Sequence, residues 1–519
     1  MSRYIIGVHS GHDSSACLFK DNVLINAIAK ERLTRKKHDS GDPVECIEYL
    51  LEISKINKSD IDMVIRCNWY DSTELKNEYY NDFKNVIINK NHHLFHAYAL
   101  TLVNPDTDML ILILDGRGCR LEDAEKKNKT GKNLFESESV YKTYKNKVIQ
   151  LEKRYSEHFP NLYKWGSHLD SVGYAYAAVS KAIFQSSNAA GKVMALASFG
   201  KKNKNIPDVF CFGEDFEINK KWLSFIESLS FPIPYESSTA KDLSYSIQNA
   251  LEKYIFSRIE TLVQKYSIKT VGISGGVALN CTNNGIIANL LTIEDLFVFP
   301  ASGDDGISIG AAVWAIRELL NDNRKIEWKI GLGKVYRETV HNNQEVKKLI
   351  KLLMSGECIG LFENGSEYGP RALCNRSIIA DASRIEMKNH INLNVKQREP
   401  FRPFGGVVLE KNLKLLTNDK LASPYMLSAA KIKPEYQHII PALVHADGTV
   451  RLQIVSDKNM IIYKILEEYE LETGRIVLIN TSFNAKGEPI VETESEAMLS
   501  AKKMGIRYVM ISGTLQDVT

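Results

Sequence analysis

The sequence lacks the features that mark secreted, membrane-spanning and thiol-based redox proteins. Its first residues, MSRYIIGVHSGHDSSACLF, contain no basic stretch followed by an apolar one, so we expect no secretory signal. No apolar run approaches the about 20 residues that a membrane helix needs. None of the eight cysteines forms a C-x-x-C pair, which argues against a zinc ribbon or a dithiol redox site. We therefore expect a cytoplasmic protein with reduced cysteines and no membrane contact.

The sequence also lacks a large net charge. Its 519 residues carry a formal charge of +3, without the basic excess that nucleic-acid binding usually requires. We therefore expect no nucleic-acid partner. The length predicts two or three domains, and we expect a monomer or a homodimer.

Repeated patterns of strands and turns predict a duplicated α/β architecture. Residues 4–19 and 109–118 each look like a buried strand that runs into a small polar or glycine-containing turn. Residues 269–291 and 296–320 each look like a strand, a glycine-rich turn and a helix. Two such starts and two such units favour two similar lobes.

The best domain boundary is the polar segment 321–344, which has no sustained periodicity. We therefore predict one domain over residues 1–340 and a second α/β domain over residues 341–519. Residues 120–160 are rich in lysine and glutamate, and we expect them to form a solvated insertion.

Two histidines suggest a metal site. His92 and His96 stand four residues apart, on one face of a helix if the segment is helical, and could both reach one ion. On spacing alone, two surface or hydrogen-bonded histidines are the commoner explanation. In the segment SGDDG, where a strand meets a helix, Asp305 is the expected helix cap and Asp304 the candidate third ligand.

Cations set among prolines predict a pocket for a polyanion. The segments GPRALCNRSIIAD and VKQREPFRPF carry Arg371, Arg376, Lys396, Arg398 and Arg402. Guanidinium groups bind phosphate oxygens in pairs of hydrogen bonds, while the prolines exclude one continuous helix. Further along, Arg451, Ser482 and Asn484 lie at strand-like segments and are additional candidates. The alternatives are a solvated basic surface and, for the serine and the asparagine, ordinary turn hydrogen bonds.

These motifs together resemble the nodulation and antibiotic O-carbamoyltransferases over nearly the whole chain. The matching segments are GHDSSACL, ERLTRKKH, HHLFHA, GKVMALASFG, GGVALNC, FPASGDDGISIGAA, GPRALCNRSI, VKQREPFRPF and NTSFN. The resemblance implies an N-terminal, duplicated actin-like (ASKHA) domain similar to the universal tRNA threonylcarbamoyl-transfer protein. It also implies a C-terminal α/β domain similar to YrdC. Cys374 stands where the family pattern has glycine.

The resemblance further implies an ATP-dependent O-carbamoyltransferase of the kind used in antibiotic biosynthesis. Its partners would be carbamoyl phosphate, ATP with magnesium, and a small-molecule acceptor. The C-terminal domain would form carbamoyl-adenylate, and the N-terminal domain would transfer the carbamoyl group with the help of a divalent metal, iron in this family. No motif identifies the acceptor, which offers a hydroxyl or an amine.

Carried over position by position, the resemblance assigns these roles. The metal ligands are His92, His96 and Asp304. The residues that hold carbamoyl phosphate and ATP are Arg371, Lys396, Arg402, Arg451 and Asn484, to which the pattern of cations and turn residues adds Arg376, Arg398 and Ser482. The residues of the transfer site are His12 and Lys36. The residues of the N-terminal nucleotide loops are Asp115, Gly116, Gly118, Gly275 and Gly276.

Two other functions fit parts of the pattern. One is a tRNA threonylcarbamoyl-type transferase, against which the low net charge counts. The other is a non-catalytic actin-like regulator that binds ATP, in which the histidine pair would be structural.

Overall fold

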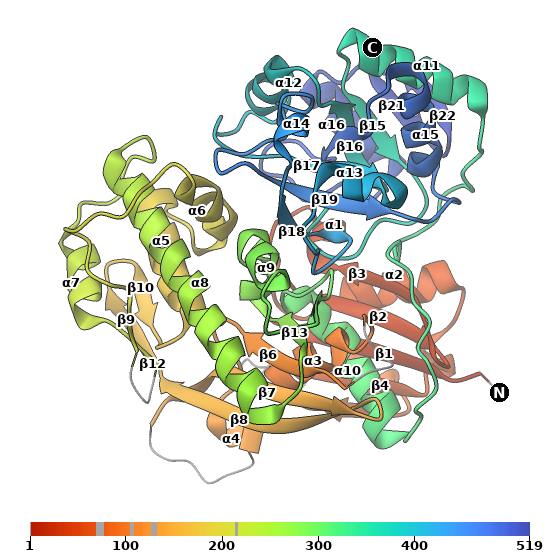
Figure 1. The fold of residues 1–519 in the computed structure, drawn as a ribbon. Helices are drawn as coiled ribbons and strands as arrows, with labels where there is room; N and C mark the ends of the chain where they lie inside the picture. The colour runs from red at the N-terminus through yellow and green to blue at the C-terminus, as the bar shows by residue number, and fades with distance from the viewer. Residues whose placement is uncertain (1, 69–76, 104–107, 126–131, 213–215, 519) are drawn as a thin grey trace. The chain divides into compact units, whose positions relative to one another are not determined.

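The computed structural model describes residues 2–68, 77–103, 108–125, 132–212 and 216–518, which form three large sheets and their covering helices (Figure 1). The chain divides into two compact units. The first contains Met1–Val64, Asn77–Val86 and Ile326–Thr519, and the second contains Ile65–Lys76 and Ile87–Lys325. The boundary at residues 340/341 stays a prediction. None of the described helices is long and apolar enough to cross a membrane.

The first sheet begins with a three-stranded antiparallel meander. Its strand order is β3-β2-β1-β4-β5. The strands are β1 (Tyr4–Ser10), β2 (Ser15–Lys20), β3 (Val23–Ala29), β4 (Met63–Asn68) and β5 (Val86–Ile88). The helices α1 (Lys30–Thr34) and α2 (Val44–Ser54) follow β3, and the apolar side chains of α2 pack on the sheet.

The second sheet has the order β14-β13-β6-β7-β8. Listed from β8, it has the same arrangement as the first sheet: the third, second, first, fourth and fifth strands in chain order lie side by side. Its strands are β6 (Leu110–Leu114), β7 (Leu134–Tyr144), β8 (Lys147–Glu157), β13 (Thr270–Ser274) and β14 (Asp295–Val298). The hairpin β7–β8 is antiparallel, whereas β6, β13 and β14 run parallel. The two sheets therefore share one strand order, and the duplicated domain stays a prediction.

Helices surround the second sheet within its unit, and Figure 1 shows the long α8 beside α5. They are α3 (His92–Leu100), α4 (Leu121–Glu125), α5 (Val172–Phe184), α6 (Ala190–Ala197), α7 (Lys220–Ser228), α8 (Ser238–Tyr266), α9 (Cys281–Ala288) and α10 (Ile307–Trp314). Two small hairpins complete the unit: β9 (Phe159–Tyr163) with β10 (Gly166–His168), and β11 (Phe210–Phe212) with β12 (Phe216–Ile218).

The prediction of a solvated insertion at residues 120–160 is wrong. Much of this segment forms β7 and β8 of the second sheet, and Val140 and Tyr141 are fully buried. Two of the glutamates that suggested solvation are buried and paired inside the unit. Glu136 forms a close ion pair with Lys153, and Glu138 accepts a hydrogen bond from Arg258 at 2.7 Å. Buried charges of this kind are tolerated because each has a partner.

The third sheet has eight strands in the order β18-β19-β17-β20-β16-β15-β21-β22. They are β15 (Ile359–Phe362), β16 (Arg376–Asp381), β17 (Gly405–Leu409), β18 (Tyr425–Lys431), β19 (Thr449–Val455), β20 (Val477–Ser482), β21 (Tyr508–Ile511) and β22 (Thr514–Asp517). Neighbouring residues of a strand, such as Ile378 and Ile379, belong to different apolar clusters, because successive side chains point to opposite faces. Both faces of this sheet are therefore buried.

Helices cover the third sheet, with α11 packed against α15. The helices of this segment are α11 (Asn343–Ser355), α12 (Ile385–Asn389), α13 (Leu413–Leu416), α14 (Pro434–Gln437), α15 (Ile461–Thr473) and α16 (Glu494–Met504). The expected α/β character of the C-terminal segment is confirmed.

Candidate active site

The histidine pair lies on a helix that packs unusually close to its neighbour. His92 and His96 are one turn apart on α3, and both are fully buried. Gly310 of α10 makes the close packing possible, because a Cβ atom at that position would lie 1.8 Å from the carbonyl oxygen of Phe95. This contact brings α3 against the beginning of α10, where Asp304 stands.

Two aspartates reach the histidines from the sheet. Asp115 follows the last residue of β6, and Asp304 lies in the connection between β14 and α10. Since β6, β13 and β14 are parallel, their carboxyl ends share one edge of the sheet. The same edge carries the glycine turn after β13, where Gly275 has a φ of 92° and leaves no room for a side chain beside Leu114.

The four side chains form one compact cluster. Nε2 of His92 lies 3.1 Å from Oδ2 of Asp115 and 3.4 Å from Oδ1 of Asp304. Nε2 of His96 lies 3.6 Å from Oδ1 of Asp304 and 3.9 Å from Oδ2 of Asp115. One ligand atom from each of the four residues lies within 4.8 Å of all the others. The structure thus brings together the three predicted ligands and adds Asp115.

The cluster fits a divalent metal. Burial alone lowers the pKa of His92, but the carboxylates of Asp304 and Asp115 outweigh it and raise this pKa to about 10. Both ring nitrogens of His96 are buried and make no hydrogen bond to any described residue. A buried imidazole rarely lacks partners, and a metal bound by two imidazoles and two carboxylates would supply one. Such a donor set suits iron, zinc or manganese.

Asp115 has a second role that the sequence suggested. Its Oδ1 accepts hydrogen bonds from the backbone N–H groups of Gly116 at 2.8 Å and Gly276 at 3.2 Å. The two glycine turns that were predicted as nucleotide loops therefore meet at Asp115. Gly118 packs on β7, where a Cβ atom would lie 2.5 Å from Oε2 of Glu136. The sequence did contain a signal for Asp115 as a ligand: it follows the apolar strand β6, just as Asp304 comes after the strand β14.

The predicted helix cap at Asp305 is wrong. Residues 304–306 form a short 3₁₀ turn, and α10 then begins with Gly306 at the N-cap position and no side-chain cap. A Cβ atom at Gly306 would lie 1.9 Å from the carbonyl oxygen of Ala301, so the tight turn before the helix requires glycine there.

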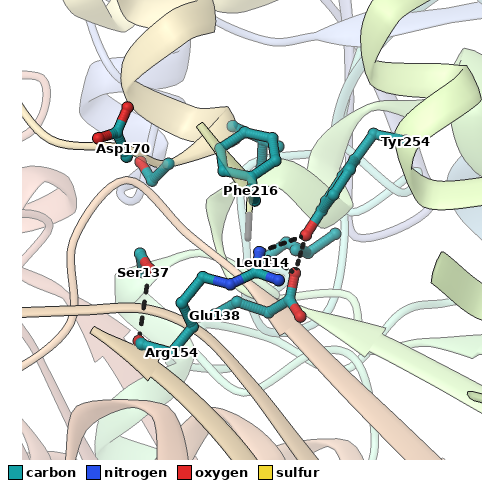
Figure 2. A pocket seen from close by; sticks show the side chains of 9 residues that line it. Leu114, Ser137, Glu138, Arg154, Asp170, Phe216 and Tyr254 are labelled. Atoms are coloured by element: carbon teal, nitrogen blue, oxygen red, sulfur yellow. Dashed lines mark hydrogen bonds and ion pairs between the residues drawn. The ribbon is translucent and has the colours of Figure 1, made fainter. Parts of the chain in front are cut away.

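A pocket lies beside Leu114, the residue that precedes Asp115 (Figure 2). Figure 2 shows Arg154 and Tyr254 directed at Glu138; the tyrosine hydroxyl donates to the carboxylate and accepts from Arg154. At its edge, the Ser171 hydroxyl donates to the carbonyl oxygen of Gly116 at 2.8 Å. Glu138 and Arg154 form an ion pair at 3.7 Å, and Asp170 contacts His168 at 3.5 Å. We assign this pocket no ligand.

The predicted polyanion site centres on Lys396. This side chain is buried, and its Nζ donates to the carbonyl oxygens of Ser482 at 2.7 Å and Asn484 at 2.6 Å. It also donates to Oδ1 of Asn484 at 2.8 Å. Lys396 thus fixes the turn after β20, and three of the predicted residues lie together.

Other cations stand close to that lysine. Burial, together with repulsion from Arg398, Lys37 and Arg402, holds the pKa of Lys396 well below its usual range. Burial and the neighbouring Arg402 and Arg451 likewise hold the pKa of Arg398 well below its usual range. The nearest counter-charge to Arg402 is Glu399, whose carboxylate lies 3.9 Å away. Cations crowded together with so little acid form a site that an anion would stabilise.

Arg376, like Lys396, makes hydrogen bonds to the protein itself. It is fully buried, and its guanidinium donates to the carbonyl oxygens of Glu363, Asn364 and Asn375. The guanidinium also lies over the ring of Phe362 at 3.6 Å. A role for Arg376 in ligand binding stays a prediction.

The turn that precedes Arg376 accommodates the unusual cysteine. Cys374 has a φ of 69°, in the left-handed region that favours glycine. Its thiol is buried and donates to Oε1 of Gln453 at 3.3 Å, and it lies 3.3 Å from Nδ2 of Asn480. These contacts explain how a side chain fits where the family pattern has glycine. Arg371 stands in the same turn and is half-buried.

The residues predicted for carbamoyl transfer differ in their surroundings. Nδ1 of His12 lies 2.9 Å from Oδ2 of Asp13, and the ring of His12 stacks on that of His38. Lys36 follows α1 and is exposed. The sequence analysis did not single out Asp13 or His38, although both stand in the quoted segments GHDSSACL and ERLTRKKH.

Comparison with known proteins identifies the family. The family model for the carbamoyltransferase N-terminus matches residues 4–81 and 73–313, and that for the carbamoyltransferase C-terminus matches residues 350–517. The chain therefore belongs to the carbamoyltransferase family, and the resemblance drawn from the motifs is confirmed. Its relatives indicate a transferase, and they include nodulation proteins and a 3'-hydroxymethylcephem-O-carbamoyltransferase.

Two relatives illustrate the match. The nodulation protein NolNO of Sinorhizobium fredii is 29% identical over 94% of this chain and 76% of its own length. The 3'-hydroxymethylcephem-O-carbamoyltransferase of Amycolatopsis lactamdurans is 30% identical over 47% of this chain and 48% of its own. Among solved structures, HypF of T. kodakarensis is 16% identical over 62% of this chain and 48% of its own, with a TM-score of 0.39, too low to assign a fold.

Proposed function

We propose that this protein is an ATP-dependent O-carbamoyltransferase that activates carbamoyl phosphate as carbamoyl-adenylate and passes the carbamoyl group to a hydroxyl of a small natural product. The observation that carries the proposal is the crowded set of cations around Lys396 within the segment that matches the carbamoyltransferase C-terminus. Carbamoyl phosphate and ATP, bound with magnesium, are both anionic. Their phosphate groups would supply the negative partners that these cations need.

In the first step, one water molecule cleaves the P–O bond of carbamoyl phosphate and releases inorganic phosphate and carbamate. A carbamate oxygen then attacks the α-phosphorus of ATP, and the bond to pyrophosphate breaks, so that pyrophosphate leaves. Arg371, Arg402 and Arg451 are our candidates for binding the phosphate oxygens, since guanidinium groups neutralise the charge that develops there. Lys396 holds Asn484 in place through the hydrogen bonds described above. Carbamate decarboxylates in water, so the site must be closed to bulk water while carbamate waits to attack ATP.

In the second step, the acceptor hydroxyl attacks the carbamoyl carbon and AMP leaves. His92, His96, Asp115 and Asp304 would hold the metal, which when bound supplies Lewis-acid activation of the carbamoyl oxygen or the acceptor hydroxyl. Iron is the metal that the family resemblance suggests. His12 is our candidate for taking the hydroxyl proton, since an imidazole is a suitable base near neutral pH.

The finer structural predictions belong to the same proposal. They are an actin-like duplicated domain over residues 1–340 and a YrdC-like domain over residues 341–519. The repeated strand order of the first two sheets supports the first of these. A cytoplasmic location and a monomeric or homodimeric state stay predictions from the sequence.

The test measures pyrophosphate release in the presence of ATP and carbamoyl phosphate. We expect release to require both substrates, and Arg402→Ala to slow it by roughly tenfold to a hundredfold, the effect of losing one charge-assisted hydrogen bond. The control is Arg507→Ala, because Arg507 is exposed and pairs with Asp517 at 2.9 Å on the last hairpin. Release without carbamoyl phosphate, or equal losses in both variants, would contradict the proposal.

A further inference from the structure

Asp13 stands between two histidines and contacts both. Its Oδ2 lies 2.9 Å from Nδ1 of His12, and its Oδ1 lies 2.8 Å from Nδ1 of His38. The two imidazole rings stack with their centroids 5.2 Å apart and an angle of 21° between their planes. In both rings Nδ1 faces the carboxylate, so Nε2 lies on the side of the ring away from Asp13.

The backbone fixes this arrangement from both sides. The Ser14 N–H donates to the carbonyl oxygen of Asp39 at 3.0 Å, and the Ser14 hydroxyl donates to that of Gly41 at 2.6 Å. The N–H of His38 donates to Oε2 of Glu31 at 3.0 Å. The turn after β1 and the loop after α1 are therefore joined, and they hold Asp13 and His38 together.

The side chains remain open enough to meet a small molecule. The side chains of His12 and His38 are 40% and 39% exposed, whereas that of Asp13 is 26% exposed. A carboxylate set behind two more exposed imidazoles is the arrangement that orients a histidine base.

We propose that Asp13 and His38 are positioning residues for His12 in carbamoyl transfer. Asp13 accepts Nδ1–H from His12 and leaves the lone pair on Nε2, while His38 holds the other carboxylate oxygen. The inference rests on the proposed function. In the step, the acceptor oxygen forms its bond to the carbamoyl carbon, and its proton moves to Nε2 of His12. The bond between that carbon and the adenylate oxygen breaks, and AMP keeps the electron pair.

The charge of Asp13 supports this role. Burial alone would raise the pKa of Asp13, but its hydrogen bonds to His12 and His38 outweigh burial and lower the pKa to about 2. The carboxylate is therefore ionised at neutral pH and can accept from both rings.

Few other titratable groups face the cluster. Nε2 of His9 lies 3.1 Å from the carbonyl oxygen of His12. Glu31 is engaged by the backbone N–H of His38, and Nζ of Lys30 donates to the carbonyl oxygens of Ser40 and Asp42. Asp39 lies in the joined loop and accepts from the N–H of Ser40 at 3.1 Å. Asp13 is thus the carboxylate in ion-pair contact with both imidazoles.

The first test needs no acceptor molecule. Diethyl pyrocarbonate reacts with neutral imidazole, and peptide mapping by mass spectrometry reports the rate at each histidine of the full-length protein. In Asp13→Asn, the charge that favours imidazolium is lost, and we expect His12 to react at least about threefold faster at pH 6 than in the unaltered protein. Asp39→Asn, in the same joined loops, is the matched control and should leave the rate unchanged.

Two results of this test would overturn the proposal. One is an unchanged His12 rate in Asp13→Asn. The other is a slow reaction of both His12 and His38 with diethyl pyrocarbonate in the purified protein that becomes fast when a chelator such as EDTA is added. The three side chains would then hold a cation instead of a proton.

The second test separates positioning from activation. With 3'-hydroxymethylcephem as a probe acceptor, Asp13→Asn should reduce carbamoylated product by at least roughly a hundredfold while pyrophosphate release persists, since asparagine stabilises the wrong imidazole tautomer. His38→Asn keeps an N–H donor and should retain more transfer than His38→Ala. Equal transfer in the asparagine and alanine variants, or equal loss of pyrophosphate release, would contradict the proposal. If the unaltered protein neither releases pyrophosphate nor makes product, the proposed function fails, and the carbethoxylation rates still decide the positioning of His12.

Discussion

Glu363 offers a sharp test of the interior around the predicted anion site. It follows β15, and its side chain is 1% exposed. One carboxylate oxygen accepts from the N–H of Gly513 at 2.9 Å and the other from the hydroxyl of Thr339 at 2.8 Å. Burial outweighs these hydrogen bonds and raises the pKa of Glu363 from 4.5 to about 7. The change we consider is Glu363→Gln, which keeps the shape and removes the charge.

The sign follows from the direction of the pKa. The folded protein binds the proton of Glu363 more tightly than the unfolded chain does, so ionisation favours unfolding. The penalty is small below pH 4.5, grows as the pH rises from 4.5 to 7, and is constant above. One pKa unit corresponds to about 1.4 kcal/mol, so the penalty above pH 7 is about 3 kcal/mol. Between pH 5 and pH 8, Glu363 should therefore lower the free energy of unfolding by about 2–3 kcal/mol.

The assay is urea unfolding at pH 5 and pH 8 for the unaltered protein and for Glu363→Gln. Other groups titrate over the same range, so the relevant quantity is the difference between the two proteins at each pH. Relative to glutamate, we expect glutamine to be more stabilising at pH 8 than at pH 5, by about 2–3 kcal/mol. Glutamine can still accept from Gly513 and donate to Thr339, so its hydrogen bonds do not obscure the effect. A difference that does not change with pH, or that changes in the opposite sense, would refute the reasoning.

Two further predictions concern the candidate metal site. His96→Ala should abolish bound metal, measured by elemental mass spectrometry on the purified protein, and should leave pyrophosphate release intact. The control is His341→Ala, because His341 is exposed. Metal retained in His96→Ala would contradict the site. Gly310→Ala should lower the free energy of unfolding by about 1–3 kcal/mol and weaken metal retention, because the added methyl group forces α3 away from α10. Gly191→Ala in α6, where the added Cβ has no heavy atom within 4 Å, should be neutral or stabilising by about 0.5–1 kcal/mol, and equal destabilisation of both variants in urea unfolding would show that the close packing of the two helices is not the cause.

Charged residues account for the main errors of the sequence interpretation. The lysines and glutamates of β7 and β8 looked solvated, yet Glu136 finds Lys153 on the neighbouring strand and both become buried. A strand that buries paired charges lacks the apolar alternation by which a buried strand is usually predicted. The partner of each charged residue depends on the register between the two strands. Arg376 stands in a basic motif and donates to carbonyl oxygens of its own fold, and its role in ligand binding stays a prediction.

The sequence by itself determined the family, the α/β character and three of the four residues of the candidate metal cluster. Motifs such as GPRALCNRS and the four-residue spacing of His92 and His96 are local, so they can be seen in the chain before it folds. The tertiary structure decided which distant groups meet. Parallel strands placed Asp115 beside Asp304, and two joined loops placed His38 beside Asp13. Those contacts depend on strand register and loop packing, and neither is encoded in the spacing of the residues that make them.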